Sequence, residues 1–119
     1  MQPGRYNITV YKGTTFSLAP VWKIDNSPVD ITNYTVDMQV RAATDQPIIV
    51  ELSTANGKVS INGPLGQITL TLSAAQTTAL TAGNYFYDLN LTSPDSTVWK
   101  ILQGAFNVAE SVKIGRAHV

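Results

Sequence analysis

Residues 80–93, which read LTAGNYFYDLNLTS, decide the fold class of this chain. Apolar side chains recur at every second position from Tyr85 to Leu91, and polar side chains fill most of the positions between them. A period of two is typical of a β-strand with one buried face, because successive side chains of a strand point to opposite sides. Phe86 is the exception on the polar face, and we expect it to cover a sheet edge or to contact a partner.

The same alternation recurs at residues 34–42 (YTVDMQVRA) and 67–73 (QITLTLS). β-Branched and aromatic residues fill further candidate strands, as the surface of a pleated sheet prefers. These candidates are YNITVYK (6–12), TFSLAPVWK (15–23), IIVELS (48–53), KVSI (58–61) and TVWKILQGAFNVA (97–109). About eight short strands separated by turn residues indicate a sandwich or a barrel.

Three local signals refine this pattern. Asn56-Gly57 lies between two candidate strands and predicts a hairpin turn. Pro20 predicts an edge strand or a bulge, because proline cannot donate a hydrogen bond to a strand ladder. Gly104 predicts a bulge or a close approach of another backbone segment.

A helical turn and a tyrosine precede the strand quoted first. Ser73 and Gln76 have the spacing of a capping box, so we expect one helical turn near residues 74–80. Leu80, Gly83 and Tyr85 have the spacing found in many immunoglobulin-like sandwiches at the corner before a late strand. In those folds the tyrosine hydroxyl donates a hydrogen bond back to the chain's own backbone.

Tyr85 is the candidate for this corner, and Tyr87 is the alternative; an ordinary core tyrosine after a turn also fits the pattern. We therefore predict an all-β chain. Its fold is a single immunoglobulin-like antiparallel β-sandwich of about 7–9 strands over residues 1–112, with the short helical turn near residues 74–80.

The composition suits one folded domain of 119 residues, since apolar residues make up 44% of the chain. The formal net charge is zero, so the chain lacks the excess of positive charge that is typical of a nucleic-acid binder. No run of like charges indicates an anionic membrane surface, and no apolar segment approaches the ~20 residues that span a bilayer. The absence of cysteine excludes disulfides and thiolate metal sites. The first residues, MQPGRYNITV, do not resemble a signal peptide, so we expect synthesis in the cytoplasm.

Oxygen-bearing side chains occur in two predicted turns. Asp25, Asn26 and Asp30 lack the spacing of a calcium loop, and Asp95 lies in the turn SPDST. We interpret both groups as turn residues that hydrogen-bond their own backbone.

Three carboxylates fall on predicted strands: Asp37, Glu51 and Asp88. None pairs with another by spacing, as acid–base catalysis would require, and we expect salt bridges to Arg41 or Lys100 instead. No glycine-rich phosphate loop precedes a helix. We therefore predict no catalytic, cofactor-binding or metal-binding residue, and a protein that is not an enzyme.

Two further patterns concern carbohydrate. Asn-x-Thr triplets begin at Asn7, Asn33 and Asn90. We interpret them as strand and turn composition, because no signal peptide accompanies them. Four aromatic residues offer a stacking platform for a sugar ring, with placement of the tryptophans in the core as the alternative. These residues are Trp22, Trp99, Phe86 and Phe106.

Three ordered segments carry a resemblance to a known group. They are YNITVYKGTTFSLAPVWK (6–23), PVDITNYTVDMQVR (28–41) and GQITLTLSAAQTTALTAGNYFYDLNLTSPDSTVWKILQGAFNV (66–108). Over residues 4–112 the chain resembles a widespread group of small phage proteins. Through VDITNYTVDMQV it is more loosely similar to the N-terminal immunoglobulin-like domain of phage baseplate upper proteins.

The resemblance implies a virion structural protein that acts as an adaptor or attachment domain in the tail, baseplate or neck. A capsid decoration or cement protein is the first alternative, and a carbohydrate- or receptor-binding module is the second. The resemblance also implies that the partners are other virion structural proteins and that the chain occurs in repeated copies or as a homo-oligomer. It implies no nucleic-acid partner and no membrane partner. The shared positions imply fold determinants and no catalytic residues: Trp22, Asp30, Tyr34, Leu80, Gly83, Tyr85, Tyr87, Asp88 and Gly104.

The two ends of the chain differ from the strand pattern. The first five residues, MQPGR, suit either an arm that pairs with a sheet edge of a neighbouring chain or a frayed terminus. Residues 113–119, KIGRAHV, continue neither a strand nor a helix pattern and contain the only histidine, His118. IGRAHV equals the translation of a widely used sequencing-adapter DNA, so adapter read-through is our hypothesis for its origin. We place residues 113–119 outside the core and no site on His118.

Overall fold

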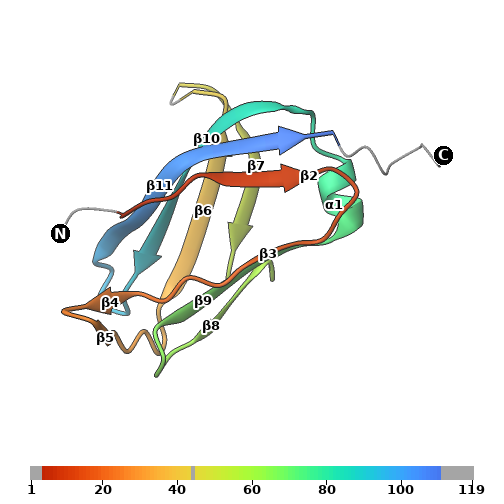
Figure 1. Cartoon of the computed structure of the whole chain (residues 1–119). Coiled ribbons are helices and arrows are strands. Elements are labelled where there is room, and N and C mark those ends of the chain that lie inside the picture. Colours follow the sequence, from red (N-terminus) through yellow and green to blue (C-terminus); the bar gives the residue numbers. More distant parts are fainter. Residues whose placement is uncertain (1–3, 44, 111–119) are drawn as a thin grey trace.

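Two β-sheets enclose an apolar core in the computed structural model, which describes residues 4–43 and 45–110 (Figure 1). The larger sheet has the strand order β1–β11–β10–β6–β7, and β2 also pairs with β11. Its strands are β1 (Gly4–Arg5), β2 (Ile8–Tyr11), β6 (Thr35–Arg41), β7 (Ile48–Ser53), β10 (Gly83–Thr92) and β11 (Val98–Ala109).

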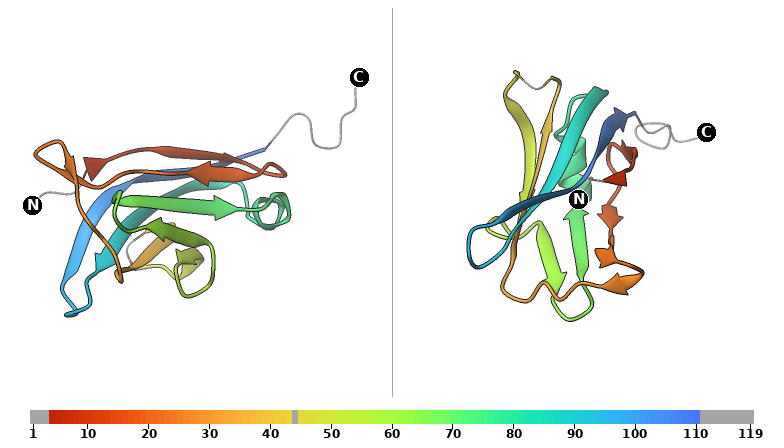
Figure 2. Two further views of the ribbon diagram at one scale, coloured as in Figure 1. Left: turned by 90° about the horizontal axis from the view of Figure 1, so that it is seen from below. Right: turned by 90° about the vertical axis from the view of Figure 1, so that its left-hand side faces the viewer.

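The smaller sheet has the order β3–β9–β8 and packs against the larger one (Figure 2). Its strands are β3 (Phe16–Leu18), β8 (Val59–Asn62) and β9 (Gln67–Leu72). A separate hairpin, β4 (Lys23–Ile24) with β5 (Ser27–Pro28), lies at the end of the sandwich opposite the helix α1 (Ala74–Thr78) (Figure 1). The predicted all-β immunoglobulin-like sandwich with one short helical turn is confirmed.

One edge of the larger sheet adds a feature that the prediction of an antiparallel sandwich did not contain. β1 and β2 pair with β11 in parallel, with Gly4 opposite Leu102 and Ile8 opposite Phe106. The other paired strands run antiparallel. The direction of pairing has no signature in an alternating pattern, because both kinds of strand bury every second side chain.

The core consists of the alternating side chains that the sequence places on one face. Nineteen hydrophobic side chains form one cluster of buried residues. The largest of those with almost no exposed surface are Phe106, Ile31, Met38, Leu52, Ile68, Leu70, Leu72, Leu89 and Leu91. Phe106 also meets Phe16 edge to face, with ring centroids 6.4 Å apart, and so joins the two sheets.

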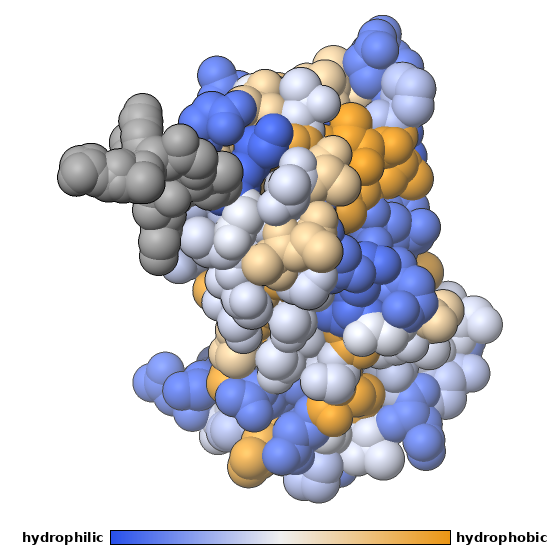
Figure 3. Space-filling model, turned by 90° about the vertical axis from the view of Figure 1, so that its right-hand side faces the viewer, coloured by the Kyte–Doolittle hydropathy of each residue, from blue (hydrophilic) through white to orange (hydrophobic). Residues whose placement is uncertain are grey.

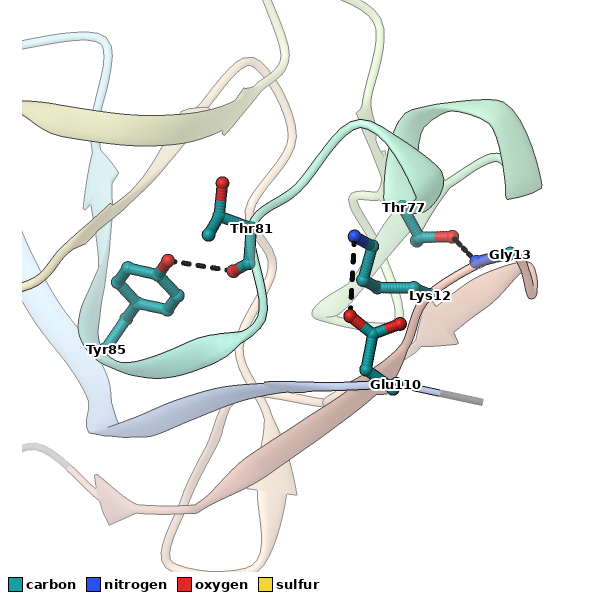
Figure 4. A network of polar contacts seen from close by, with 6 residues as sticks. All are labelled: Lys12, Gly13, Thr77, Thr81, Tyr85 and Glu110. Atoms are coloured by element: carbon teal, nitrogen blue, oxygen red, sulfur yellow. Dashed lines mark hydrogen bonds and ion pairs between the residues drawn. The ribbon is translucent and has the colours of Figure 1, made fainter. Parts of the chain in front are cut away.

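Tyr85 forms the predicted tyrosine corner, so the alternative Tyr87 is not needed there. Its hydroxyl donates to the carbonyl oxygen of Thr81 at 2.8 Å (Figure 4). Gly83 leaves room for the ring, because a Cβ at this position would lie 3.3 Å from the Tyr85 hydroxyl. Leu80, which is 9% exposed, anchors the start of the corner in the core.

Removal of the corner hydroxyl tests its contribution. We expect Tyr85→Phe to lower the free energy of unfolding by about 1 kcal/mol, the net value of one hydrogen bond. Denaturant unfolding at neutral pH measures this. Tyr11→Phe is the matched control, since Tyr11 is 53% exposed and we expect a change within about 0.5 kcal/mol for such a surface position. Equal stability of the two variants would contradict a structural role of the corner.

The helix α1 is built as the capping box predicts. The Gln76 N–H donates to Ser73 Oγ at 3.1 Å, and the Ser73 N–H donates to Gln76 Oε1 at 2.7 Å. The fully buried Thr77 then ties the helix to the β2–β3 loop. Its Oγ1 accepts from the Gly13 N–H at 3.0 Å (Figure 4). It also donates to the Thr14 carbonyl oxygen at 2.8 Å.

The hairpin predicted at Asn56-Gly57 is wrong. β7 pairs with β6 and β8 pairs with β9, so this turn carries the chain from one sheet to the other. The Asn56 side chain organises the crossing, because its Oδ1 accepts from the N–H groups of Ser53 and Lys58, each at 3.0 Å. The sequence pattern predicts such a turn but not the sheet to which each flanking strand belongs.

Pro20 lies in a break of a predicted strand, and Gly104 lies where another backbone segment approaches closely. β3 ends at Leu18, before Pro20, and the predicted strand 15–23 resumes as β4. Gly104 allows close approach of the β1–β2 segment, because a Cβ there would lie 2.3 Å from the Tyr6 carbonyl oxygen.

The predictions for residues 113–119, including His118, lie outside the described residues, as do residues 1–3 of the N-terminal MQPGR segment. Gly4 and Arg5 of that segment form β1. Among the described residues, no helix has the length and apolar character needed to cross a bilayer.

Candidate functional site

The outer face of the larger sheet carries an open groove of about 610 Å³ beside Phe86. Phe86 lies between Arg41 on β6 and Ala105 on β11 in one row across the sheet. Ala105 is small, so the surface is hollow next to the Phe86 ring. Phe86 is 59% exposed, as expected for a large apolar residue on the polar face of its strand.

Three cations and one carboxylate line this groove: Arg5, Arg41, Lys100 and Asp88. Lys100 Nζ lies 3.5 Å from Asp88 Oδ2, which confirms the expected salt bridge of Asp88. Arg41 instead donates to the Gln46 carbonyl oxygen at 2.7 Å and to Gln39 Oε1 at 2.9 Å. Within the described part of the chain, neither Arg41 nor Arg5 forms an ion pair.

Tyr87 supports the groove from the core side. It is 4% exposed, and its hydroxyl donates to the Tyr6 carbonyl oxygen at 2.6 Å. Burial, and to a lesser degree the neighbouring Tyr6, raises the pKa of Tyr87 to about 12. The hydroxyl therefore stays protonated and holds β10 to the β1–β2 segment across Gly104.

Asp37 and Glu51 form an acidic pair on β6 and β7, outside the groove lining. Asp37 Oδ2 accepts from Gln39 Nε2 at 3.0 Å, whereas Oδ1 is buried without a hydrogen-bond partner in the described structure. Burial, and after it the neighbouring Glu51 carboxylate, raises the pKa of Asp37 to about 6. The ionised pair therefore opposes folding at neutral pH.

Asp37→Asn tests this cost through its pH dependence. Because folding raises the pKa of Asp37 from 3.8 to about 6, the folded state binds the proton more tightly, and Asp37 costs stability as the pH rises through that window. We expect the variant to match the wild type near pH 4 and to exceed it by about 1 kcal/mol at pH 7.5, after allowance for solvent screening.

Thermal unfolding of both proteins across this pH range gives the measurement. Glu51→Gln is the second arm, because removal of the neighbouring charge lowers the pKa of Asp37 and gives part of the same gain at pH 7.5. An Asp37→Asn gain of equal size at pH 4 and pH 7.5 would contradict the ionisation argument.

The predicted turn carboxylates do not gather into a site. Asp25 and Asn26 have φ values of 53° and 67° and form the turn of the β4–β5 hairpin. Asp30 Oδ1 accepts from the Thr32 N–H at 3.0 Å and from its hydroxyl at 2.6 Å, which lowers the pKa of Asp30. Over residues 4–43 and 45–110, no cluster of three potential metal-binding side chains occurs.

Asp95 likewise organises its own turn between β10 and β11. The Ser93 hydroxyl and, at 3.1 Å, the Thr97 N–H donate to Asp95 Oδ1. These hydrogen bonds lower the pKa of Asp95. The interpretation of Asp95 as a turn residue is confirmed.

The four aromatic residues considered for sugar binding do not form one platform. Trp22 is 9% exposed and Phe106 is fully buried, so both belong to the core. Trp99 packs on Trp22 with ring centroids 5.8 Å apart and lies opposite Leu91, a buried position of β10. Phe86 points to the other face of the sheet. Core packing explains Trp22 and Phe106, whereas Trp99 is 37% exposed and lies on the opposite face of the sheet from Phe86, so the platform built from all four is wrong.

The exposed edge at β7 is protected against pairing with another strand. A register shift between Val40 and Arg41 places a bulge at Ile49. Asn56 Nδ2 donates to the Glu51 carbonyl oxygen at 2.9 Å, and Asn56 Oδ1 accepts from the Ser53 N–H. The bulge distorts backbone groups of β7, and the Asn56 side chain occupies others, so these groups cannot pair with an added strand. The groove, rather than this edge, is therefore the candidate site.

The comparisons with known proteins add a structural likeness. No family model and no curated protein matches the chain. Among solved structures, it is similar to the crystal structure of CopC from Methylosinus trichosporium OB3b, at 12% identity and a TM-score of 0.47, over 94% of this chain and 91% of that one. A likeness of this extent says nothing about what the chain binds.

The sequence pattern singled out Phe86 but did not place the other groove residues around it. Arg41 and Lys100 were expected only as salt-bridge partners, Arg5 only as part of the MQPGR segment, and Ala105 only as part of a predicted strand. Ala105 acquires its role from its place beside Phe86 across the sheet, and this cross-strand register has no signal in the local sequence.

Proposed function

We propose that this chain is a phage virion structural protein that acts as an attachment domain in the tail, baseplate or neck. The resemblance of residues 4–112 to small phage proteins supports the setting. The observation that carries the attachment role is the exposed Phe86 on the polar outer face, beside a groove with two arginines. Aromatic residues and arginine are enriched in protein interfaces, and charged residues surround rather than fill their centres.

The arrangement suits binding better than catalysis. Asp88 is engaged by Lys100 at 3.5 Å, and the acidic pair of Asp37 and Glu51 lies outside the groove lining. A rigid sheet presents the groove, so little conformational entropy is lost when a partner docks. The capsid decoration role remains the alternative position in the particle for the same kind of domain.

Deletion of the gene and rescue with variants tests the proposal. We expect the wild-type protein to be recovered in purified particles and Phe86→Asp to be depleted about thirtyfold, the effect of one interface hot spot of 2 kcal/mol. Leu65→Asp is the matched control, because Leu65 is 55% exposed in the turn between β8 and β9.

Equal incorporation of both variants would reject the outer face as the attachment surface. Absence of the wild-type protein from particles would reject the virion role itself. A density map of the particle then separates the tail, baseplate or neck from the capsid lattice.

A further inference from the structure

The groove beside Phe86 has room for an apolar side chain of a partner. Ala105 lies on its floor, and the exposed Phe86 ring forms a wall directly across from Ala105. Small residues beside an exposed aromatic ring create a recess in which an inserted side chain loses contact with water on several sides. Burial of apolar area in such a recess is a typical source of binding energy.

The rim of the groove is cationic. Arg5 reaches it from β1 and Arg41 from β6, two strands that lie on opposite sides of β10 in the sheet. Hydrogen bonds to Gln39 and Gln46 hold the Arg41 guanidinium in place and use only part of its donor capacity. A pre-oriented guanidinium forms strong paired hydrogen bonds with a carboxylate.

We propose that the groove binds an acidic segment of a neighbouring protein, which inserts an apolar side chain between Phe86 and Ala105 and places carboxylates against Arg5 and Arg41. This inference rests on the proposed attachment function and names the chemistry of its partner. The chain as a whole has no net charge, so the excess of cations is local to the groove and selects among partners.

Two other occupants fit less well. Face-to-face pairing of two copies by a two-fold axis would bring the two cationic rims together, which costs energy. A nucleic acid fits less well because the chain has a formal net charge of zero, whereas nucleic-acid binders present an extended positive surface that contacts many phosphates. Both remain measurable outcomes of the experiment.

The probe is a short labelled peptide with a central phenylalanine flanked by aspartate and glutamate. Backbone amide shifts in two-dimensional NMR locate its binding on the full chain, and fluorescence anisotropy measures its Kd. We expect shifts at Phe86 and Ala105. We also expect Arg5→Glu to weaken binding about tenfold and Ala105→Leu, which fills the recess, to weaken it without a change in charge. Lys23→Glu, on the β4–β5 hairpin, is the matched control and leaves the Kd unchanged.

Several results would overturn the inference. One is equal binding of a peptide with asparagine and glutamine in place of its acidic residues. Tighter binding of a single-stranded oligonucleotide at the same amides is another. The third is self-association of the protein that Arg5→Glu alters and that the peptide does not inhibit. Retention of the native NMR spectrum shows that each variant is folded.

The two proposals fail separately. Loss of Phe86→Asp from particles without any peptide binding would leave the attachment role standing and reject the acidic partner. Peptide binding together with normal incorporation of Phe86→Asp would reject the groove as the attachment surface. It would leave standing the binding of an acidic segment in the groove.

Discussion

Gly104→Ala lowers the free energy of unfolding by about 3 kcal/mol, at the upper end of the range for overpacked sites. A Cβ at Gly104 would lie 2.3 Å from the carbonyl oxygen of Tyr6 and 2.9 Å from its carbonyl carbon. Both are backbone atoms, so no side-chain rotation relieves the clash. β1 and β2 must move away from β11, and the hydrogen bonds that the Tyr87 hydroxyl and the Gln103 carbonyl make with Tyr6 weaken.

Denaturant unfolding measures the loss, and hydrogen exchange at the Tyr6 amide locates it. Gly57→Ala is the matched control: nothing lies within 4 Å of the added Cβ, and only the positive φ of +80° is unfavourable. We expect this control to cost about 1 kcal/mol. A Gly104→Ala cost no greater than that of the control would show that the β1–β2 segment is not held against β11 as described.

Phe106→Ala has the largest expected effect in the core. Phe106 is fully buried on β11 and contacts Phe16 of the smaller sheet edge to face. Removal of the ring leaves a cavity between the two sheets, because the surrounding strands relax only in part. We expect a loss of about 3–5 kcal/mol, the usual range for phenylalanine in a core.

Phe86→Ala makes the same chemical change on the neighbouring strand, at a side chain that is 59% exposed. We expect its free energy of unfolding to stay within about 0.5 kcal/mol of the wild type. Similar losses for the two variants in denaturant unfolding would contradict the assignment of Phe106 to the core and of Phe86 to the surface.

The secondary structure was largely predictable because it depends on neighbouring residues. Alternation from Tyr85 to Leu91 predicted the strand that became β10, and the spacing of Ser73 and Gln76 predicted α1. The corner at Tyr85 was also predictable, since its hydroxyl bonds to Thr81, only four residues away. Such interactions join residues that are close in the sequence, so a local sequence pattern can predict them.

Pairing between distant segments was much less predictable. Asn56-Gly57 has the composition of a hairpin turn, yet its two flanking strands lie in different sheets. The parallel pairing of β1 and β2 with β11 joins residues nearly the whole chain apart. An alternating strand reveals which face is buried, but the same pattern fits either direction and several partners.

The same distinction between local and long-range interactions applies to the candidate site. The sequence by itself determined most of the strands, the buried face of the alternating ones and the exposure of Phe86, and it offered Tyr85 as the first candidate for the corner, because these follow from local pattern and side-chain chemistry. Only the tertiary structure decided that Ala105 lies in a recess beside Phe86 and that Arg5 and Arg41 flank it. Those neighbours come from three other strands, and their meeting depends on cross-strand register, which is set by packing of the whole sandwich.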